Sequence, residues 1–187
     1  MRKIISYSSL LLLLAIALPL IGCGDSGPAQ PARQAEFGKL LQQAKQAEKT
    51  ATTELKQQQA AQERQQALSA FADSDISFTD WIMTVDEVSS HELWDLGSRK
   101  NIVLLSVAND AYRLLNQDNA LLGLPEGAIE EGSQLYAAIA GLDKGASVLV
   151  SGHFVTRDQN QLREAEDDSP LPAFVVIFTD VKPVAKP

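Results

Sequence analysis

The run SVLVSGHF, residues 147–154, decides the fold that the sequence predicts. Val148 and Val150 share one face of an extended chain there, and Leu149 and Ser151 share the other. Alternation of this kind in a run rich in β-branched residues is typical of a strand with one buried face. We therefore expect a strand over residues 146–155.

The same pattern recurs on both sides of this run and defines a domain over residues 74–187. Further strands are expected at residues 76–88, 101–107 and 173–184, with a third strand somewhere within 112–129. A short helix is expected at residues 131–142, where Ser133 is a natural N-cap. This order is that of the OB-fold, a five-stranded, partly open barrel with a helix between strands three and four. The predicted fold class is therefore mainly β: a five-stranded OB-like barrel with one short helix, preceded by a long polar N-terminal helix.

The residues of this domain also resemble a known family. The resemblance rests on Leu142-x-x-Gly145-x-x-Val148-x-Val150-Ser151-Gly152-x-Phe154, then Pro172-x-Phe174 and Phe178-Thr179-Asp180-Val181. This pattern is similar to bacterial OB-fold proteins of the tRNA_anti-like kind, over roughly residues 76–184. The resemblance implies an OB barrel, and the family name reflects a nucleic-acid-binding relative.

The charge of the chain argues against a nucleic-acid partner. The whole chain carries a net charge of −8, and residues 74–187 hold 18 acidic and 8 basic residues, a net charge of −10. Proteins that bind single-stranded nucleic acids use a basic groove with stacking aromatic rings. We therefore expect no nucleic-acid partner.

The first 22 residues have the pattern of a signal peptide. Arg2 and Lys3 precede an apolar run at residues 10–21, which is shorter than the roughly 20 residues of a spanning helix. The run ends in Leu20-Ile21-Gly22-Cys23, which resembles the bacterial lipobox. The resemblance implies cleavage before Cys23, lipid attachment to its thiol and a place in the cell envelope. Two alternatives stay open: an ordinary signal peptide with a chance cysteine, or an uncleaved anchor helix.

Two further features bear on the site of anchoring. Cys23 is the only cysteine of the chain, so an internal disulfide framework is excluded. Gly24 follows it and Asp25 comes one residue later, whereas the enteric pattern for inner-membrane retention has aspartate directly after the cysteine. This favours a periplasm-facing protein of the outer membrane rather than the inner one.

Residues 23–33 are expected to form a flexible tether and residues 34–72 a helical spacer rich in glutamine and alanine. Such a helix would reach about 50 Å and hold the barrel away from the membrane. A heptad-like apolar series between residues 37 and 55 keeps a second interpretation open, a stalk that self-associates weakly. The series covers barely two heptads, so the spacer is favoured.

Residues with catalytic or metal-binding chemistry are sparse. The two histidines, His91 and His153, are expected on the surface, and the acidic run Glu164, Glu166, Asp167 and Asp168 is expected in a solvated loop. No catalytic residue, metal ligand or cofactor is predicted. The alternative is a metal-dependent (Ca or Zn) envelope enzyme or cation-binding protein, which requires these histidines and carboxylates to meet at one point.

The favoured function is a non-enzymatic binding or assembly module for an envelope protein, peptide or glycan. OB barrels bind ligands on strands two and three and on the adjoining loops. The candidate partner-binding residues on that face are Trp94, Asn101, Val103 and Leu105. For Trp94 two roles stay open, an exposed anchor for a partner or a lid over the end of the barrel.

Overall fold

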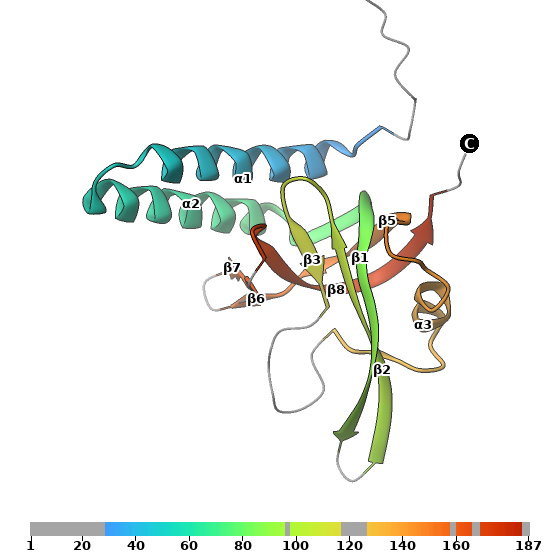
Figure 1. Ribbon diagram of the computed structural model, residues 1–187. Helices are drawn as coiled ribbons and strands as arrows, with labels where there is room; N and C mark the ends of the chain where they lie inside the picture. The colour runs from blue at the N-terminus through green and yellow to red at the C-terminus, as the bar shows by residue number, and fades with distance from the viewer. Residues whose placement is uncertain (1–28, 96–97, 117–126, 158–159, 166–168, 185–187) are drawn as a thin grey trace, which may run out of the picture.

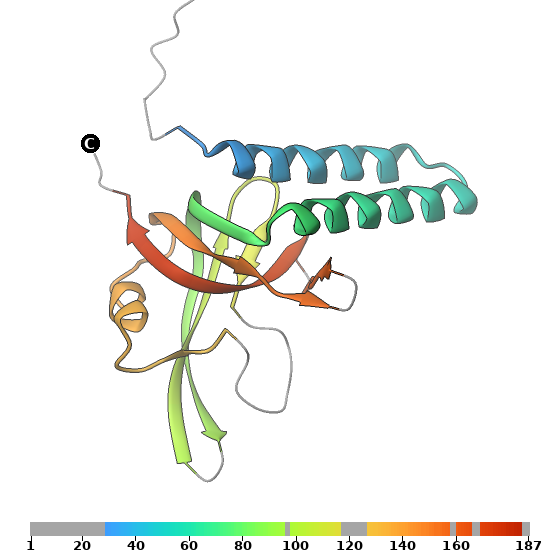
Figure 2. The same cartoon turned by 180° about the vertical axis from the view of Figure 1, so that it is seen from behind.

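The fold is mainly β, with helices packed against one end of a curled sheet. The computed structural model describes residues 29–95, 98–116, 127–157, 160–165 and 169–184, with Trp94 and Asp95 described by their backbone alone. A six-stranded sheet encloses most of the core, and two long helices lie side by side across one end of it (Figures 1 and 2). A short third helix packs beside the sheet.

The N-terminal segment forms two antiparallel helices rather than the single long helix predicted. These are α1 (Ala32–Thr50) and α2 (Glu54–Ser74), and the chain reverses at residues 51–53. Thr53 caps α2 by accepting a hydrogen bond from the backbone N–H of Lys56 at 3.4 Å. Threonine forms helices less readily than alanine, glutamine or lysine, so the cluster Thr50-Ala51-Thr52-Thr53 is the sequence signal for this break.

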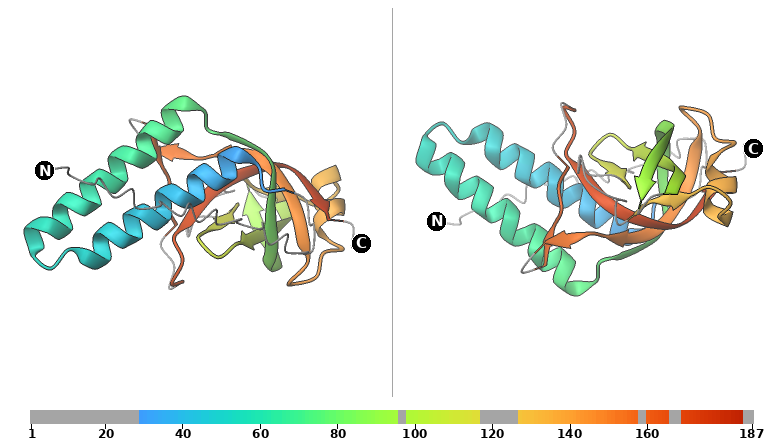
Figure 3. Two further views of the ribbon diagram at one scale, coloured as in Figure 1. Left: turned by 90° about the horizontal axis from the view of Figure 1, so that it is seen from above. Right: turned by 90° about the horizontal axis from the view of Figure 1, so that it is seen from below.

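The helices are part of the core, so the prediction of a separate spacer over residues 34–72 is wrong. The first half of α1 lies over the end of the sheet (Figure 3), and Phe37 on this helix is fully buried. Its ring centroid lies 4.9–5.7 Å from the centroids of five other rings, which α2 and the sheet domain contribute: Phe71, Trp81, Tyr112, Phe154 and Phe174.

The apolar series between residues 37 and 55 is divided between core and solvent. Phe37 and Leu41 are buried in the chain's own core, whereas the side chain of Leu55 is 75% exposed. A seam for self-association would need these residues on one accessible surface. The alternative of weak self-association through residues 37–55 would have to do without Phe37 and Leu41, which the chain's own core uses.

The sheet closes on itself into a barrel-like shape. Its strands are β1 (Ser77–Asp95), β2 (Ser98–Ala108), β3 (Arg113–Leu115), β4 (Ile129–Glu130), β5 (Ser147–Phe154) and β8 (Ala173–Pro183). The first half of β1 pairs with β5 and its second half pairs with β2, which completes the ring β1-β2-β3-β8-β5. All of these pairings are antiparallel except that of β3 with β8. A small hairpin of β6 (Thr156–Arg157) and β7 (Gln161–Leu162) stands beside α2.

The elements between β2 and β5 agree with the sequence prediction. The third strand, β3, lies within the predicted window of residues 112–129. The predicted helix is present as α3 (Gln134–Ile139), and Ser133 caps it by accepting a hydrogen bond from the Tyr136 N–H at 3.1 Å. The first strand is longer than predicted, because β1 continues to Asp95 instead of ending near residue 88.

Gly152 is required where β5 bends. The register between β5 and β8 shifts between Ser151 and Gly152. A Cβ atom at residue 152 would overlap the carbonyl oxygen of Ile177 and lie 2.9 Å from the ring of Phe78. Only glycine allows the two strands to approach this closely while the sheet curves around the core.

A buried glutamine connects α1 to β1. The Gln34 side chain is 1% exposed; its Nε2 donates to the Ile82 carbonyl at 2.7 Å, and its Oε1 accepts from the Ile82 N–H at 2.9 Å. The pairing of β1 with β2 begins only at Thr84, so β2 does not reach Ile82. The glutamine amide therefore replaces a neighbouring strand at this residue and satisfies two backbone groups that burial would leave unpaired.

We predict that Phe37→Ala lowers the free energy of unfolding by about 3–5 kcal/mol, because it opens a cavity among five rings. Chemical denaturation of the wild type and the variant measures the difference. A variant lacking residues 1–72 is expected to lose cooperative unfolding for the same reason. An unchanged midpoint in that truncated chain would show that the helices do not stabilise the barrel.

We predict that Gln34→Leu lowers the free energy of unfolding by about 1–3 kcal/mol, since the Ile82 N–H and C=O lose their partner. Gln42→Leu is the matched control, because Gln42 is exposed on the same helix and its change should stay within about 0.5 kcal/mol. Equal effects of the two substitutions in urea unfolding would contradict the assigned role of Gln34.

Candidate functional site

The second half of β1 and the first half of β2 form a ribbon that projects from the barrel. In this ribbon, residues 87–95 of β1 pair with residues 98–106 of β2 (Figure 1). Its tip lies on the opposite side of the molecule from the start of α1 (Figures 1 and 2). Just beyond its midpoint toward the tip, Asn101 Nδ2 donates to Glu131 Oε2 at 2.6 Å, and Lys100 Nζ lies 2.9 Å from Glu130 Oε1.

The predicted partner-binding residues divide between this ribbon and the core. Asn101 is exposed on the ribbon. Trp94 pairs with Arg99 through its backbone near the tip, and its side chain lies outside the described part of the chain. Val103 and Leu105 are only 3% and 1% exposed. Their assignment to a binding surface is wrong, because both side chains belong to the core that the sheet encloses.

The two histidines do not meet. His91 is exposed on the ribbon, in β1 rather than in the predicted loop, and His153 lies in β5 opposite Ile177 of β8. Within the residues that the structure describes, no group of three or more histidine, cysteine, aspartate or glutamate side chains is placed to hold a metal ion. Of the predicted acidic loop only Glu164 is described, because residues 166–168 lie outside the described ranges.

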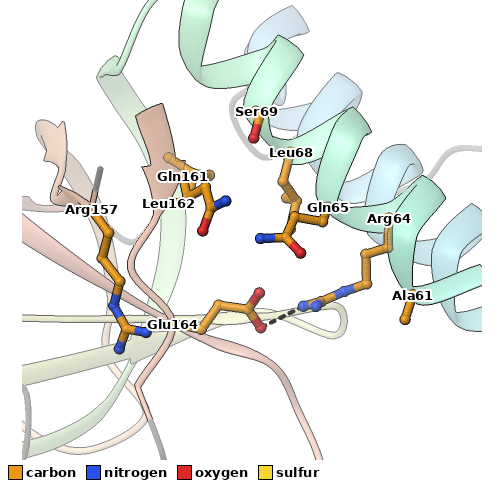
Figure 4. A pocket seen from close by; sticks show the side chains of 9 residues that line it. All are labelled: Ala61, Arg64, Gln65, Leu68, Ser69, Arg157, Gln161, Leu162 and Glu164. Atoms are coloured by element: carbon orange, nitrogen blue, oxygen red, sulfur yellow. Dashed lines mark hydrogen bonds and ion pairs between the residues drawn. The ribbon is translucent and has the colours of Figure 1, made fainter. Parts of the chain in front are cut away.

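A groove of about 230 Å³ lies between α2 and the β6–β7 hairpin (Figure 4). Residues on both sides line it: Ala61, Arg64, Gln65, Leu68, Ser69, Arg157, Gln161, Leu162 and Glu164. The Arg64 guanidinium donates to Glu164 at 2.5 Å and lies 4.0 Å from a carboxylate oxygen of Glu48. The groove is thus polar, and carboxylates from the chain itself already neutralise Arg64.

Among the described residues, Tyr112 has the largest pKa shift, and it lies in the core, outside the ribbon and the groove lining. Burial raises the pKa of Tyr112, and the nearby side chains of Gln34 and Asn109 offset only part of that rise. In the part of the chain that the structure describes, no residue forms a hydrogen bond of regular geometry with its hydroxyl, although the hydroxyl is enclosed in the core. This tyrosine stays neutral at physiological pH and contributes packing rather than charge.

Asp75 and Lys182 have smaller shifts, each caused by a close neighbour. The Ser77 N–H donates to Asp75 at 2.8 Å and lowers the pKa of that carboxyl, at the junction of α2 and β1. Asp180 raises the pKa of Lys182 on the outer face of β8. Both are local surface interactions and do not form a reactive centre.

Five basic side chains of the barrel are bound to acidic ones: Arg99, Lys100, Arg113, Lys144 and Lys182. Ion pairs join Arg99 to Glu92 at 3.1 Å and Arg113 to Asp86 at 3.2 Å, besides the pair of Lys100 described above. A phosphate backbone would have to compete with these carboxylates for each cation. These three cations are therefore already paired with carboxylates of the chain.

No protein-family model, curated protein or solved structure matched the chain when it was compared with them. Cys23 and most of the predicted tether lie outside the described residues. None of the helices in the described part is long and apolar enough to cross a membrane.

We predict that oligonucleotides do not bind at physiological salt, even at about 100 µM, the weak end of non-specific binding. The expectation rests on the net charge of −10 over residues 74–187 and on the paired state of Arg99, Arg113 and Lys100. Titration of single-stranded DNA and RNA, followed by tryptophan fluorescence, tests it. Saturable, salt-sensitive binding below that concentration would overturn the argument from charge.

Proposed function

We propose that this chain is a lipid-anchored protein of the bacterial cell envelope, in which an OB-like barrel acts as a non-enzymatic binding or assembly module for a protein, peptide or glycan. The observation that carries the proposal is the projecting β1–β2 ribbon. It extends from the side of the barrel opposite the start of α1. A lipid anchor at Cys23 would attach to the chain before the start of α1. An anchored molecule would therefore present the ribbon away from the membrane.

The strand order supports an OB-like assignment for the barrel. The ring β1-β2-β3-β8-β5 contains five strands, and its one parallel pairing joins β3 to β8. Along the chain, the short helix α3 lies between β3 and β5, which are the third and fourth of these five strands in sequence order. An OB barrel combines five strands with a helix in that place, and in such barrels ligands are bound by strands two and three and by adjoining loops. The ribbon includes the first half of that second strand, β2, paired with the second half of β1.

The path of the helices changes how the anchored domain is positioned. Because α2 runs back along α1, the barrel lies next to the first turn of α1 and not about 50 Å beyond it. Only residues 23–31 separate a lipidated Cys23 from this turn, and nine residues span at most about 30 Å. The barrel of an anchored molecule would stay close to the membrane surface, and the helical hairpin would extend sideways from it.

We predict that Cys23→Ala abolishes lipid labelling and blocks maturation of the chain. Cys23 is the only thiol, so no other residue can take the lipid through a thioether. Radiolabelled palmitate and the mobility of the chain on a gel measure both effects. Label retained by the alanine variant would contradict anchoring at this residue.

The binding role is tested by capture of partners from envelope fractions. A ribbon-shortened variant, in which an Asn-Gly turn replaces residues 92–101 and joins the paired residues His91 and Ile102, should lose partners that the intact chain retains. Leu55→Ser is the matched control, because Leu55 is exposed on α2 and the change leaves the ribbon intact. Failure of the intact chain to retain any envelope component would overturn the proposed function.

A further inference from the structure

The hydrogen bonds of β2 show which way the ribbon's backbone groups point. The Asn101 carbonyl accepts from the Glu131 N–H at 2.9 Å, on the side of β2 that faces away from β1. The Leu105 N–H donates to Asn116 Oδ1 at 2.7 Å, and its carbonyl accepts from the Asn116 N–H, on that same side. The odd-numbered residues of β2 in this stretch therefore direct their peptide groups away from β1.

In an antiparallel ladder, a residue whose peptide groups point away from the partner strand lies opposite a residue whose peptide groups also point away from the ladder. The residues of β1 opposite these residues of β2 therefore direct their peptide groups toward the outer edge of β1. Those residues are Val88, Ser90 and Glu92, which pair with Leu105, Val103 and Asn101. Their N–H and C=O groups face outward along β1. No other described strand forms hydrogen bonds with these groups, because β5 pairs with β1 only as far as Thr84. Within the described residues, this stretch of β1 is thus an open sheet edge.

An open edge is a template for an added strand, and proteins usually blunt such edges with charge, bulges or a covering element. Here the ladder has a bulge between Val85 and Glu87, and the strand then continues to Asp95. The edge is long enough to take an extended segment of several residues by β-addition, in which main-chain hydrogen bonds supply affinity.

The charge of β1 selects the kind of segment. Residues 77–95 include five acidic residues and no lysine or arginine. Glu92 is partly neutralised by Arg99, whereas Glu87 is exposed and makes no ion pair with any described residue. A segment with lysine or arginine side chains would complement this edge. A second copy would bring Glu87 and Glu92 of one edge against the same carboxylates of the other, which like-charge repulsion disfavours.

We propose that the outer edge of β1, from Val88 to Glu92, binds an extended, lysine- or arginine-bearing segment of a partner protein as an added strand. The inference rests on the proposed function, because it specifies how the ribbon of the binding module would recognise its partner. Glu87 and Glu92 lie on opposite faces of the strand, so a segment with lysine at alternate positions meets one of these two carboxylates in a given register. The backbone groups of Val88, Ser90 and Glu92 supply the hydrogen bonds.

The probe for this edge is a capped octapeptide that repeats Lys-Thr four times, added to the full chain in a nonionic detergent. We expect backbone amide exchange at Val88, Ser90 and Glu92 to slow by about tenfold when the peptide saturates the edge. The effect should weaken at high salt, because exposed charges are then screened. A Glu-Thr peptide, and a Lys-Thr peptide with alternate N-methyl groups, should give no protection.

Ser90→Pro tests the edge from the side of the protein. Proline removes the outward N–H of residue 90 without removing a bond to β2, and edge positions tolerate it. Ser90→Ala is the matched control, since it deletes the hydroxyl and keeps the N–H. The proline variant should lose peptide protection and the alanine variant should keep it. Slow exchange at Ser89 and His91, whose peptide groups face β2, verifies that the ribbon remains paired.

The proposal is overturned by an absence of protection at the three amides, by equal protection from the Glu-Thr peptide, or by protection that depends on protein concentration and not on peptide. The last would identify a second copy as the occupant. The capture experiment separates this inference from the proposed function. If the Ser90→Pro chain still retains the partners of the intact chain, strand addition is wrong while the binding role stands.

Discussion

The side chain of Phe37 holds the helical and the β parts of this molecule together. It comes from the first half of α1, far in sequence from most of the rings that it contacts, and it fills the end of the curled sheet. Without it, Tyr112, Phe154 and Phe174 would face a cavity at that end, and empty space of this kind is costly in a close-packed interior. The barrel is therefore completed by a residue outside its own strands.

The position of α1 determines that of α2 as well. Arg33, one turn before Phe37, donates through its guanidinium to backbone carbonyls of Phe71 and Asp75 at the end of α2, and its guanidinium lies 4.1 Å from the centre of the Phe71 ring. A cation at this end of a helix also interacts favourably with the helix dipole. One turn of α1 thus supplies both the plug of the barrel and the C-terminal cap of the second helix.

Two buried carboxamides complete the sheet where its strands end. Gln34 satisfies Ile82 beyond the start of the β1–β2 ladder, and Asn116 bonds the Leu105 N–H and the carbonyls of Val103 and Gly127 just after β3. Each amide offers a donor and an acceptor, as a strand would. These side chains allow short strands to close a ring without leaving buried backbone groups unpaired. Among the described residues, the outer edge of the ribbon has no such substitute, and we propose that a partner supplies the missing strand there.

The sequence by itself determined the elements whose causes are local. Apolar runs rich in β-branched residues located the strands around residues 101–107, 146–155 and 173–184, and Ser133 marked the start of α3. These patterns reflect the preference of such residues for strands and the capping of free N–H groups. Such patterns can be recognised in the sequence without knowledge of contacts between residues that are distant along the chain.

Only the tertiary structure decided which apolar residues serve the core and which surface stays open. The heptad-like spacing of Phe37 and Leu41 suits a solvated stalk as well as a helix packed on a barrel, and nothing nearby in sequence distinguishes the two. Val103 and Leu105 lie on the predicted binding strand, yet closure of the sheet turns both inward. The open edge at Ser90 likewise depends on where β5 stops pairing, because strand pairing joins residues that are distant along the chain.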